Sequence, residues 1–381
     1  MLNTPIQVAI TLGTRPEAIK LAPVIQLFQN SPDFNTKVIL TGQHREMVTQ
    51  VMKLFEISPD RDLAIMQTRQ TLTDIMCRSL QGLEALFLQL EPQLVLVQGD
   101  TSTAFAAALA AFYQKIPVGH IEAGLRTNDL LNPYPEEANR RLISQIAQLH
   151  FAPTNLAVEN LYKSGVVGEV HQTGNTVIDA LLKVAKTQPK CNISGLDWHK
   201  YRVILATVHR RENWGEPLTE IAQGFIKILD KFPDTALVLP LHKNPTVREP
   251  LKAILESHPR VFLEEPFDYS ELVGAIHNCY LVLTDSGGLQ EEAPSLGKPV
   301  LVLRETTERP EAIMAGTAKL VGTDSTNIMA ATAELLSDAA KYEKMAMAIN
   351  PFGDGHASER IMKIVKSYCG MGILPVPVPR S

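Results

Sequence analysis

Carboxylate side chains follow short apolar runs in the first half of this 381-residue sequence. Asp100 comes soon after Leu94–Gln98, and Glu122 comes directly after Val118–Ile121, with Glu136 a little further on. Carboxylates held close together raise one another's pKa, so that one can donate a proton while another accepts one. The three residues therefore indicate acid–base chemistry. A purely structural interpretation stays open, because Asp100 could cap a helix and Glu136 could pair with a helix dipole.

A glycine pair in the second half has the character of a phosphate site. The apolar run Leu281–Thr284 leads into Asp285 and then Ser286-Gly287-Gly288 ahead of a short predicted helix. Backbone N–H groups at such a turn favour an anion, and two glycines let a diphosphate come close to the backbone. An ordinary turn that needs a positive φ would show the same residues, and the pair alone does not decide between the two.

Basic residues and a histidine accompany these groups. Arg15 and Lys20 could neutralise a phosphate, although Arg15 could equally be a capping or salt-bridge arginine. His209 ends an apolar run beside Arg210, which favours a neutral imidazole suited to hydrogen bonding or proton exchange. A histidine that merely completes a strand end is the alternative. The histidines lack metal-ligand spacing, and neither GxGxxG nor a Walker A motif is present, so we expect no metal and no classical NAD or ATP site.

The elements that must position these residues form a regular series. Apolar runs without strict alternation, typical of parallel strands buried on both faces, alternate with helical patterns. They predict two doubly wound α/β domains of six strands each, with ligands bound outside the carboxyl ends of the strands and therefore in the cleft between the domains. The predicted strands are Gln7–Leu12, Lys37–Thr41, Leu94–Gln98, Val118–Ile121, His150–Ala152, Glu169–Gln172, Val203–Val208, Ala236–Pro240, Val261–Leu263, Leu281–Thr284, Val300–Leu303 and Ala318–Val321.

Turn-forming residues divide the chain. We expect a first domain over residues 1–173 and a second over 174–355. A helix over residues 356–368 is expected to pack back on the first domain, and the proline-rich stretch 370–381 is expected to be disordered.

Composition limits the function classes. The sequence is 45% hydrophobic and 20% charged with a net charge of −5, and it has no basic patch, which argues against a nucleic-acid partner. Its four cysteines lack CxxC spacing, and its longest apolar run is too short to span a bilayer. We expect a soluble cytoplasmic protein.

Motifs in the same order along the chain resemble those of the non-hydrolysing UDP-N-acetylglucosamine 2-epimerases, from about Ile6 to Ile361. They are GTRPEAIKLAPV at residues 13–24, QGDT at 98–101, HIEAGLRT at 120–127, PYPEEANR at 133–140, HRREN at 209–213, DSGGLQEEAPSLG at 285–297, TERPEA at 307–312 and NPFGDGHASERI at 350–361. The resemblance implies a GT-B fold with the active site between two Rossmann-like domains.

The resemblance also implies an activity. Members interconvert UDP-GlcNAc and UDP-ManNAc without NAD or metal, by eliminating UDP to give a 2-acetamidoglucal and adding it back, and they supply ManNAc for cell-surface polysaccharide. A homodimer is implied as well. A GT-B glycosyltransferase and a hydrolysing epimerase are the alternatives.

Residue roles carry over from the matching motifs. The implied acid–base group is Asp100, Glu122 and Glu136, with His209 near the sugar and diphosphate. The implied UDP and substrate contacts are Arg15, Lys20, Phe267, Leu272, Ser286, Gly287, Gly288, Glu292 and Arg309. Phe267 and Leu272 replace a glutamine and a phenylalanine of other members, so we expect backbone contacts there. A second, activating UDP-GlcNAc site is implied at Gln43, Arg69, Gln70, Glu136, Arg210 and His242.

Overall fold

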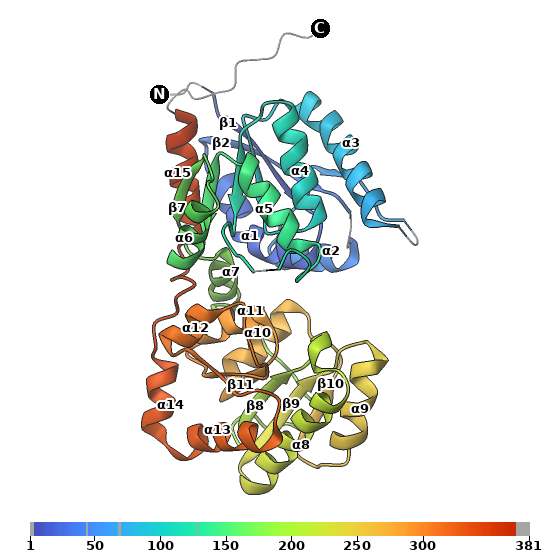
Figure 1. Cartoon of the computed structure of the whole chain (residues 1–381), viewed down its shortest axis with the longest axis vertical. Coiled ribbons are helices and arrows are strands. Elements are labelled where there is room, and N and C mark those ends of the chain that lie inside the picture. The colour runs from blue at the N-terminus through green and yellow to red at the C-terminus, as the bar shows by residue number, and fades with distance from the viewer. Residues whose placement is uncertain (1–3, 43–44, 68–69, 128, 371–381) are drawn as a thin grey trace. The chain divides into compact units, whose positions relative to one another are not determined.

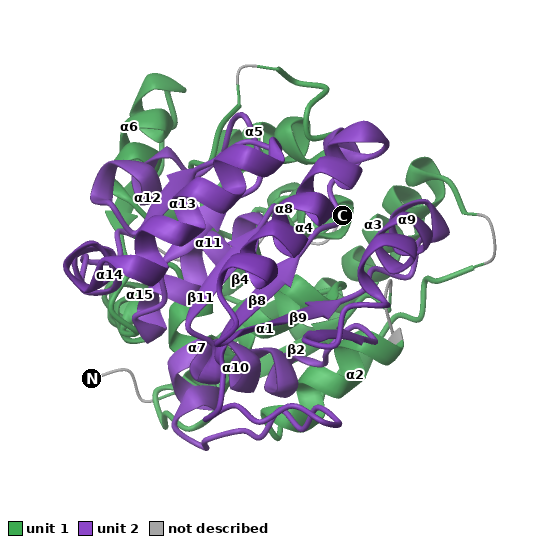
Figure 2. Cartoon of the chain, turned by 90° about the horizontal axis from the view of Figure 1, so that it is seen from below, with its two compact units in different colours: residues 1–180, 352–381 green, residues 181–351 purple. Residues whose placement is uncertain are grey.

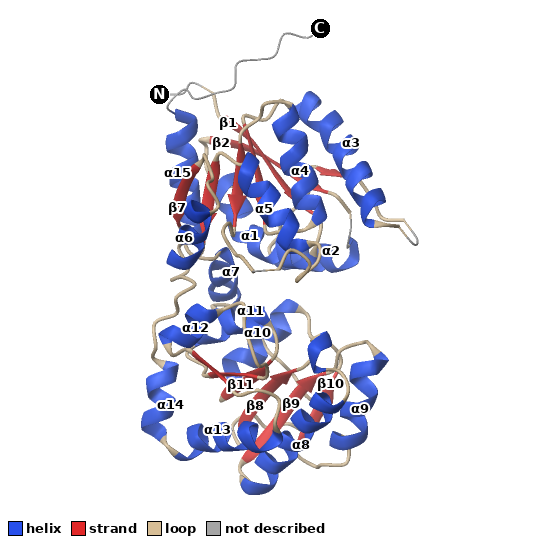
Figure 3. Cartoon of the chain, in the orientation of Figure 1, coloured by secondary structure: helices blue, strands red, loops and turns tan. Residues whose placement is uncertain are grey.

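The structure is a computed structural model that describes residues 4–42, 45–67, 70–127 and 129–370. It consists of two compact units, Met1–Ala180 together with Phe352–Ser381, and Leu181–Pro351 (Figure 2). Strands and helices alternate along the chain in both (Figures 1 and 3). The first boundary between the units falls within helix α7 (Thr176–Ala185).

Within the described residues, the first unit has one seven-stranded parallel sheet in the order β3-β2-β1-β4-β5-β6-β7. Its strands are β1 (Ile6–Leu12), β2 (Phe34–Leu40), β3 (Arg61–Asp62), β4 (Leu94–Gln98), β5 (Val118–Ile121), β6 (Leu149–Ala152) and β7 (Glu169–Gln172). Its helices are α1 (Arg15–Gln29), α2 (Arg45–Leu54), α3 (Leu72–Leu90), α4 (Ser102–Tyr113), α5 (Glu136–Ile146), α6 (Asn155–Lys163), α7 and α15 (Ala357–Gly370). Every residue of β4, β5 and β6 is buried, as expected for parallel strands covered by helices on both faces.

The second unit has a six-stranded parallel sheet in the order β10-β9-β8-β11-β12-β13 within the described residues. Its strands are β8 (Arg202–Thr207), β9 (Thr235–Pro240), β10 (Val261–Glu264), β11 (Leu281–Thr284), β12 (Val300–Val302) and β13 (Ala318–Leu320). Its helices are α8 (Glu216–Lys231), α9 (Pro245–Leu255), α10 (Tyr269–Asn278), α11 (Gly287–Glu292), α12 (Pro310–Ala315), α13 (Ser325–Ser337) and α14 (Ala339–Ala346), with short 3-10 turns at Arg211–Asn213 and Ala293–Leu296. One apolar cluster joins the sheet to α8, α9 and α13.

The predicted class of two doubly wound, Rossmann-like domains is confirmed. The predicted count of six strands in the first domain is wrong, because the structure adds β3, an exposed pair of residues beside β2. A two-residue edge strand of charged side chains carries no apolar signal. The other strands fall where the sequence predicted them, within a few residues at their ends.

The strand orders place a topological switch point in each sheet. In the first unit β1 and β4 are neighbours although β2 and β3 lie between them in the sequence, and in the second unit β8 and β11 are neighbours although β9 and β10 lie between them. The chain segments that follow these two neighbouring strands run toward opposite edges of the sheet. A crevice therefore forms at the carboxyl ends of the two strands, and ligands bind there in this fold class.

The final helix belongs to the first unit. Helix α15 contacts α1, and the fully buried side chains of Phe352, Ile361 and Val365 are part of this unit's core. It spans Ala357–Gly370, one residue later at its start and two residues later at its end than the predicted 356–368. Of the stretch 370–381 that the sequence predicts to be disordered, Gly370 is the last residue of α15, and residues 371–381 lie outside the described residues. Among the described helices, none is both long and apolar enough to cross a membrane.

Candidate active site

Asp100 lies at the switch point of the first sheet, between β4 and α4. Its Oδ2 is 2.8 Å from Nη2 of Arg140, and its side chain is 26% exposed. Burial raises the pKa of Asp100 to about 6, against the opposing effect of Arg140. Helix α4 is capped by Thr101, whose hydroxyl accepts from the Ala104 N–H, so Asp100 is not the helix cap. A carboxyl group with such a pKa can exchange a proton near neutral pH.

Glu122 directly follows β5, the next strand of the sheet. Lys20 Nζ lies 2.5 Å from its Oε1, Asn175 Nδ2 donates to the same oxygen at 3.0 Å, and Gln98 Nε2 donates to Oε2. Its backbone has a φ of 64°, a left-handed conformation that is uncommon outside glycine and clusters at functional sites. Donors from three other elements thus hold this carboxylate in one orientation.

Glu136 and Glu137 begin α5 and have different surroundings. Glu137 is fully buried and pairs with Arg141 at 2.6 Å, while its other oxygen accepts from the Thr127 N–H at 3.0 Å. Glu136 is half-buried, and its charge adds to the forces that raise the pKa of Asp100, after burial. Glu137 is thus paired with arginine side chains of α5. Among the described residues, Glu136 makes no such pair within this helix.

Glu17 connects the two loops at this switch point. It is 2% exposed and accepts hydrogen bonds from the N–H groups of Gly13 at 2.9 Å and Thr14 at 2.6 Å. The Thr101 hydroxyl donates to its other oxygen at 2.6 Å. The loop that precedes Arg15, the first residue of α1, is thereby tied to the loop that carries Asp100.

His120 contacts the backbone of the turn that carries Asp100. It is fully buried on β5, and its Nε2 lies 2.7 Å from the carbonyl oxygen of Gly99. Burial lowers the pKa of His120 to about 3, so the ring is neutral and donates from Nε2.

The switch point of the second sheet brings together His209 and Asp285. Asp285, which follows β11, is fully buried, and its Oδ2 accepts from the N–H groups of His209 and Arg210, both at 2.8 Å, and from Asn213 Nδ2 at 3.1 Å. Burial lowers the pKa of His209, while the Asp285 charge opposes this and Arg210 reinforces it. The neutral imidazole predicted from the sequence agrees with this direction.

Two guanidinium groups flank the glycine turn. A Cβ atom added at Gly287 would lie 3.5 Å from Arg210 Nη2 and 3.8 Å from Arg309 Cζ. Arg309 also pairs with the buried Glu291. Cationic groups beside a backbone without side chains favour an anion such as a phosphate.

Arg15 and Lys20 lie in α1 of the first unit, whereas the other UDP-contact candidates lie near this turn or at the start of α10. Glu292 Oε1 accepts from the hydroxyl of Tyr269 at 3.0 Å, which fixes the carboxylate at the end of α11. Phe267 and Leu272 are half-buried at the beginning of α10.

The implied second site is only partly within the described residues. Gln43 and Arg69 lie outside them. Gln70 is half-buried and accepts from the Gln67 N–H at 3.0 Å, and His242 is exposed with its ring centroid 6.2 Å from that of His209.

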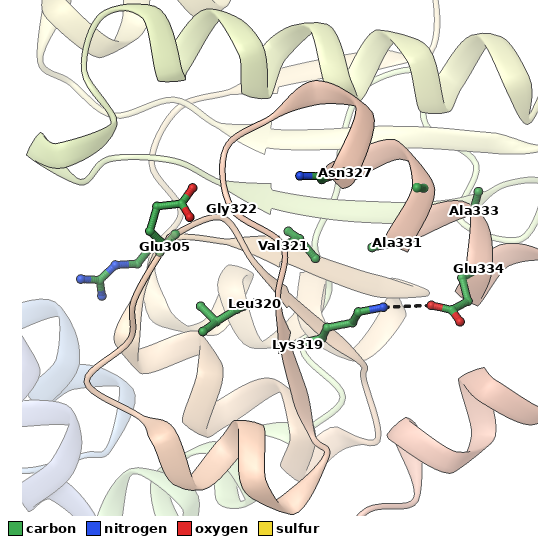
Figure 4. A pocket seen from close by; sticks show the side chains of 11 residues that line it. Glu305, Lys319, Leu320, Val321, Gly322, Asn327, Ala331, Ala333 and Glu334 are labelled. Carbon is green, nitrogen blue, oxygen red and sulfur yellow. Dashed lines mark hydrogen bonds and ion pairs between the residues drawn. The ribbon is translucent and has the colours of Figure 1, made fainter.

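A pocket of about 720 Å³ lies elsewhere in the second unit, between β13 and α13 (Figure 4). Lys319 and Glu334 on its wall form an ion pair at 3.0 Å. None of the predicted site residues lines it as far as the chain is described. Across the same described residues, no group of three or more His, Cys, Asp or Glu side chains could hold a metal ion.

Sequence reasoning missed the residues that hold the site in place. They are Glu17, Gln98, Arg140, Asn175, Asn213 and Asp285. Several of them stand inside the motifs quoted above, but their roles depend on contacts between loops far apart in the sequence.

Two Rossmann-like units, with carboxylates at one switch point and a glycine turn flanked by guanidinium groups at the other, are typical of the doubly wound class of proteins that bind ligands at the carboxyl ends of their strands. Residues 26–366 match the family model described as UDP-N-acetylglucosamine 2-epimerase. The chain belongs to this family of isomerases, and it has their GT-B-like fold.

Individual relatives agree with the assignment. The UDP-N-acetylglucosamine 2-epimerase of Escherichia coli K12 is 49% identical over 371 residues, which cover 95% of this chain and 98% of that protein. The crystal structure of the Neisseria meningitidis UDP-GlcNAc 2-epimerase bound to UDP-GlcNAc is similar with a TM-score of 0.87 at 48% identity, covering 95% of this chain and 100% of that one. A Methanocaldococcus jannaschii epimerase in complex with UDP-GlcNAc and UDP has a TM-score of 0.78 at 33% identity, with coverage of 95% and 100%.

Proposed function

We propose that this protein interconverts UDP-GlcNAc and UDP-ManNAc by inverting C2, without net hydrolysis. The observation that carries the proposal is the arrangement at the first switch point, where Asp100 has a pKa of about 6 beside the fixed carboxylate of Glu122. Transfer of a nucleotide sugar alone needs no group that removes a proton from C2. Two carboxyl groups at one sheet edge supply what such a step requires.

The proposed reaction begins with loss of UDP from C1 and of the proton from C2, which gives a 2-acetamidoglucal. The electron pair of the C2–H bond forms the C1=C2 double bond, and the electron pair of the C1–O bond leaves with UDP. Protonation of C2 on the opposite face and return of UDP to C1 complete the inversion. We assign the proton transfers to Asp100, Glu122 and Glu136.

The diphosphate is proposed to rest against Ser286, Gly287 and Gly288, with Arg15, Lys20 and Arg309 offsetting its charge. Glu292 is proposed to hold a ribose hydroxyl, and backbone groups near Phe267 and Leu272 to contact the uracil. His209 is proposed to lie beside the sugar and diphosphate. Holding UDP after it leaves keeps it available to return, which separates epimerisation from hydrolysis.

The test is incubation with UDP-GlcNAc in D₂O followed by NMR of the products. We expect UDP-ManNAc with deuterium at C2 and no requirement for added NAD. Free ManNAc with UDP would indicate a hydrolysing epimerase, and unchanged sugar nucleotide would exclude epimerisation altogether. Transfer of GlcNAc to an acceptor, without exchange at C2, would indicate a glycosyltransferase.

Two substitutions test whether Asp100 and Glu122 transfer the protons. Asp100→Asn and Glu122→Gln are expected to reduce kcat by about 100-fold or more, since proton transfer by a positioned group contributes about 10²–10⁴-fold. Binding of UDP should persist in both variants. Asp74→Asn, at the exposed cap of α3, is the matched control and should keep its activity.

We further propose activation by a second UDP-GlcNAc molecule at Gln43, Arg69, Gln70, Glu136, Arg210 and His242. Initial rates should then rise sigmoidally with UDP-GlcNAc, and UDP-ManNAc alone should react slowly until UDP-GlcNAc is added. Hyperbolic rates together with unaided conversion of UDP-ManNAc would contradict this regulation.

We also propose that the enzyme is a cytoplasmic homodimer that supplies ManNAc for cell-surface polysaccharide. Sedimentation equilibrium tests the dimer directly, and a monomer at micromolar concentration would contradict it. Deletion of the gene should remove ManNAc from the isolated polysaccharide if the supply role is correct.

A further inference from the structure

Asp285 is a fully buried carboxylate whose two oxygens have different surroundings. Its Oδ2 accepts three hydrogen bonds, two from the backbone N–H groups of His209 and Arg210 and one from Asn213. Its Oδ1 makes no hydrogen bond within the described residues. Instead, Oδ1 lies 3.8 Å from Nδ1 of His209.

An unsatisfied buried carboxylate oxygen is costly, and a nearby donor lowers that cost. The Nδ1 atom of His209 is 3.8 Å away, close enough for an ion pair and longer than a hydrogen bond. Apo geometries of this kind often tighten when a ligand binds. The His209 side chain is 37% exposed, so ligand or solvent can reach the ring.

The two residues are neighbours because of the sheet topology. Strands β8 and β11 pair in parallel with Thr207 opposite Thr284, and the hydroxyl groups of these threonines lie 2.6 Å apart. His209 and Asp285 leave the sheet just beyond this pair. The position of the carboxylate beside the imidazole is therefore set by buried backbone and does not depend on a mobile side chain.

Burial is the main cause that lowers the pKa of His209 and favours a neutral ring. The Asp285 charge opposes this effect, and Arg210, His242 and Arg304 reinforce it. A neutral imidazole carries its proton on one nitrogen only, and the hydrogen bond made by one nitrogen decides which form is present.

We propose that Asp285 is a positioning residue that selects the Nδ1–H tautomer of His209 and fixes the ring, which leaves the lone pair of Nε2 available to a substrate hydroxyl or a water molecule. This inference rests on the proposed function, in which His209 lies near the sugar and diphosphate. This role of Asp285 differs from a purely structural one. The turn at His209 and Arg210 needs only Oδ2 as an acceptor, whereas selection of the His209 tautomer needs Oδ1.

Asp285→Asn separates the two roles. The backbone N–H groups of His209 and Arg210 require an acceptor, so the amide oxygen takes the place of Oδ2 and the turn is kept. The amide NH₂ then takes the place of Oδ1 and donates to Nδ1, which forces the proton onto Nε2. A similar exchange of carboxylate for amide inverts the histidine tautomer in serine proteases.

The first measurement is the tautomer itself, read from the ¹⁵N chemical shifts of histidine-labelled protein near neutral pH. Loss of one resonance pair in His209→Gln assigns the signals. We expect the Nδ1–H form in the wild type and the Nε2–H form in Asp285→Asn. The Nε2–H form in the wild type would overturn the proposal, even if the variant did not fold.

The second measurement is kinetic. Asp285→Asn is expected to reduce kcat by about 10- to 100-fold, the range typical of groups that orient a metal-binding histidine, with KM changed by less than about 2-fold. In the His209→Gln background the same change should reduce kcat by less than about 2-fold. An equal loss in both backgrounds would show that Asp285 acts without His209 and would overturn the proposal.

Asp179→Asn is the matched control in the other unit. Asp179 is also buried and accepts backbone hydrogen bonds from Ala357 at 3.2 Å and Ser358 at 2.7 Å. Asp179 lies in α7 and accepts from the first residues of α15, so its substitution also removes a buried carboxylate that holds backbone N–H groups, and it should leave kcat unchanged. Failure of wild-type epimerisation would refute the proposed function, whereas the ¹⁵N result decides the role of Asp285 independently.

Discussion

Asp100 illustrates a conflict between stability and chemistry at a single residue. Burial raises its pKa from 3.8 to about 6, although Arg140 lies 2.8 Å away and favours the charged form. A group shifted in this direction makes the folded state bind more protons than the unfolded state between these two values. The free energy of unfolding therefore falls as the pH rises from about 4 to about 6.

Asp100→Asn should accordingly stabilise the protein while reducing its activity. Above pH 6 we expect the free energy of unfolding to rise by about 1–3 kcal/mol, because the amide avoids the cost of a buried charge. Below pH 4 both forms are neutral in the folded state, and the difference should disappear. Urea unfolding at several pH values measures this.

Asp74→Asn gives the opposite sign. The pKa of Asp74 is lowered by hydrogen bonds from Thr71, so this exposed carboxylate stabilises the folded state above its unfolded pKa and loses that effect as the pH falls. The variant should be less stable than the wild type at neutral pH and equal to it in acid. If Asp100→Asn behaved like Asp74→Asn, the burial argument would be wrong.

At the scale of elements, Glu17 links the β1–α1 loop to the β4–α4 loop through its hydrogen bonds. Glu17→Ala leaves three donors without their acceptor, on Gly13, Thr14 and Thr101. We expect the free energy of unfolding to fall by about 2–4 kcal/mol, since each unsatisfied buried group costs about 1–3 kcal/mol. Amide hydrogen exchange should increase in both loops together.

Thr101→Val is the control for this effect, because it removes a single donor to Glu17 and the cap of α4. It is expected to cost about 1 kcal/mol. An equal cost for both substitutions, or faster exchange in only one loop, would argue against the proposed link between the loops.

Most elements could be predicted from the sequence because parallel strands are continuous apolar runs. Leu94–Gln98 and Val118–Ile121 are fully buried and were predicted without error in their bounds. Arg61–Asp62 was not predictable, since edge pairing with β2 depends on the backbone alone. The site residues at strand ends could be found, whereas Glu17 and Arg140 could not, because their roles depend on which loops meet in space.

At the scale of the whole molecule, the chain returns to its first unit after completing the second. Truncation after Pro351 removes the fully buried side chains of Phe352, Ile361 and Val365 from the first unit. We expect this unit to lose more than about 5 kcal/mol, given about 2–5 kcal/mol for each large buried apolar side chain. The second unit keeps all its residues and should remain folded.

Both tryptophans, Trp198 and Trp214, are in the second unit, so their fluorescence reports on that unit alone. In the truncated protein the urea midpoint from fluorescence should match that of the full chain, while the midpoint from circular dichroism falls. A matching fall of both midpoints would mean that the second unit does not fold independently of the first.

The central claim is that C2 is inverted through departure and return of UDP. It is tested most directly with UDP-GlcNAc that carries ¹⁸O in the bridge between C1 and the β-phosphorus. If the C1–O bond breaks and UDP is retained, the label should spread to the non-bridging oxygens of the β-phosphate as UDP-ManNAc forms, which ³¹P NMR detects. Formation of UDP-ManNAc with the label still confined to the bridge would contradict the account.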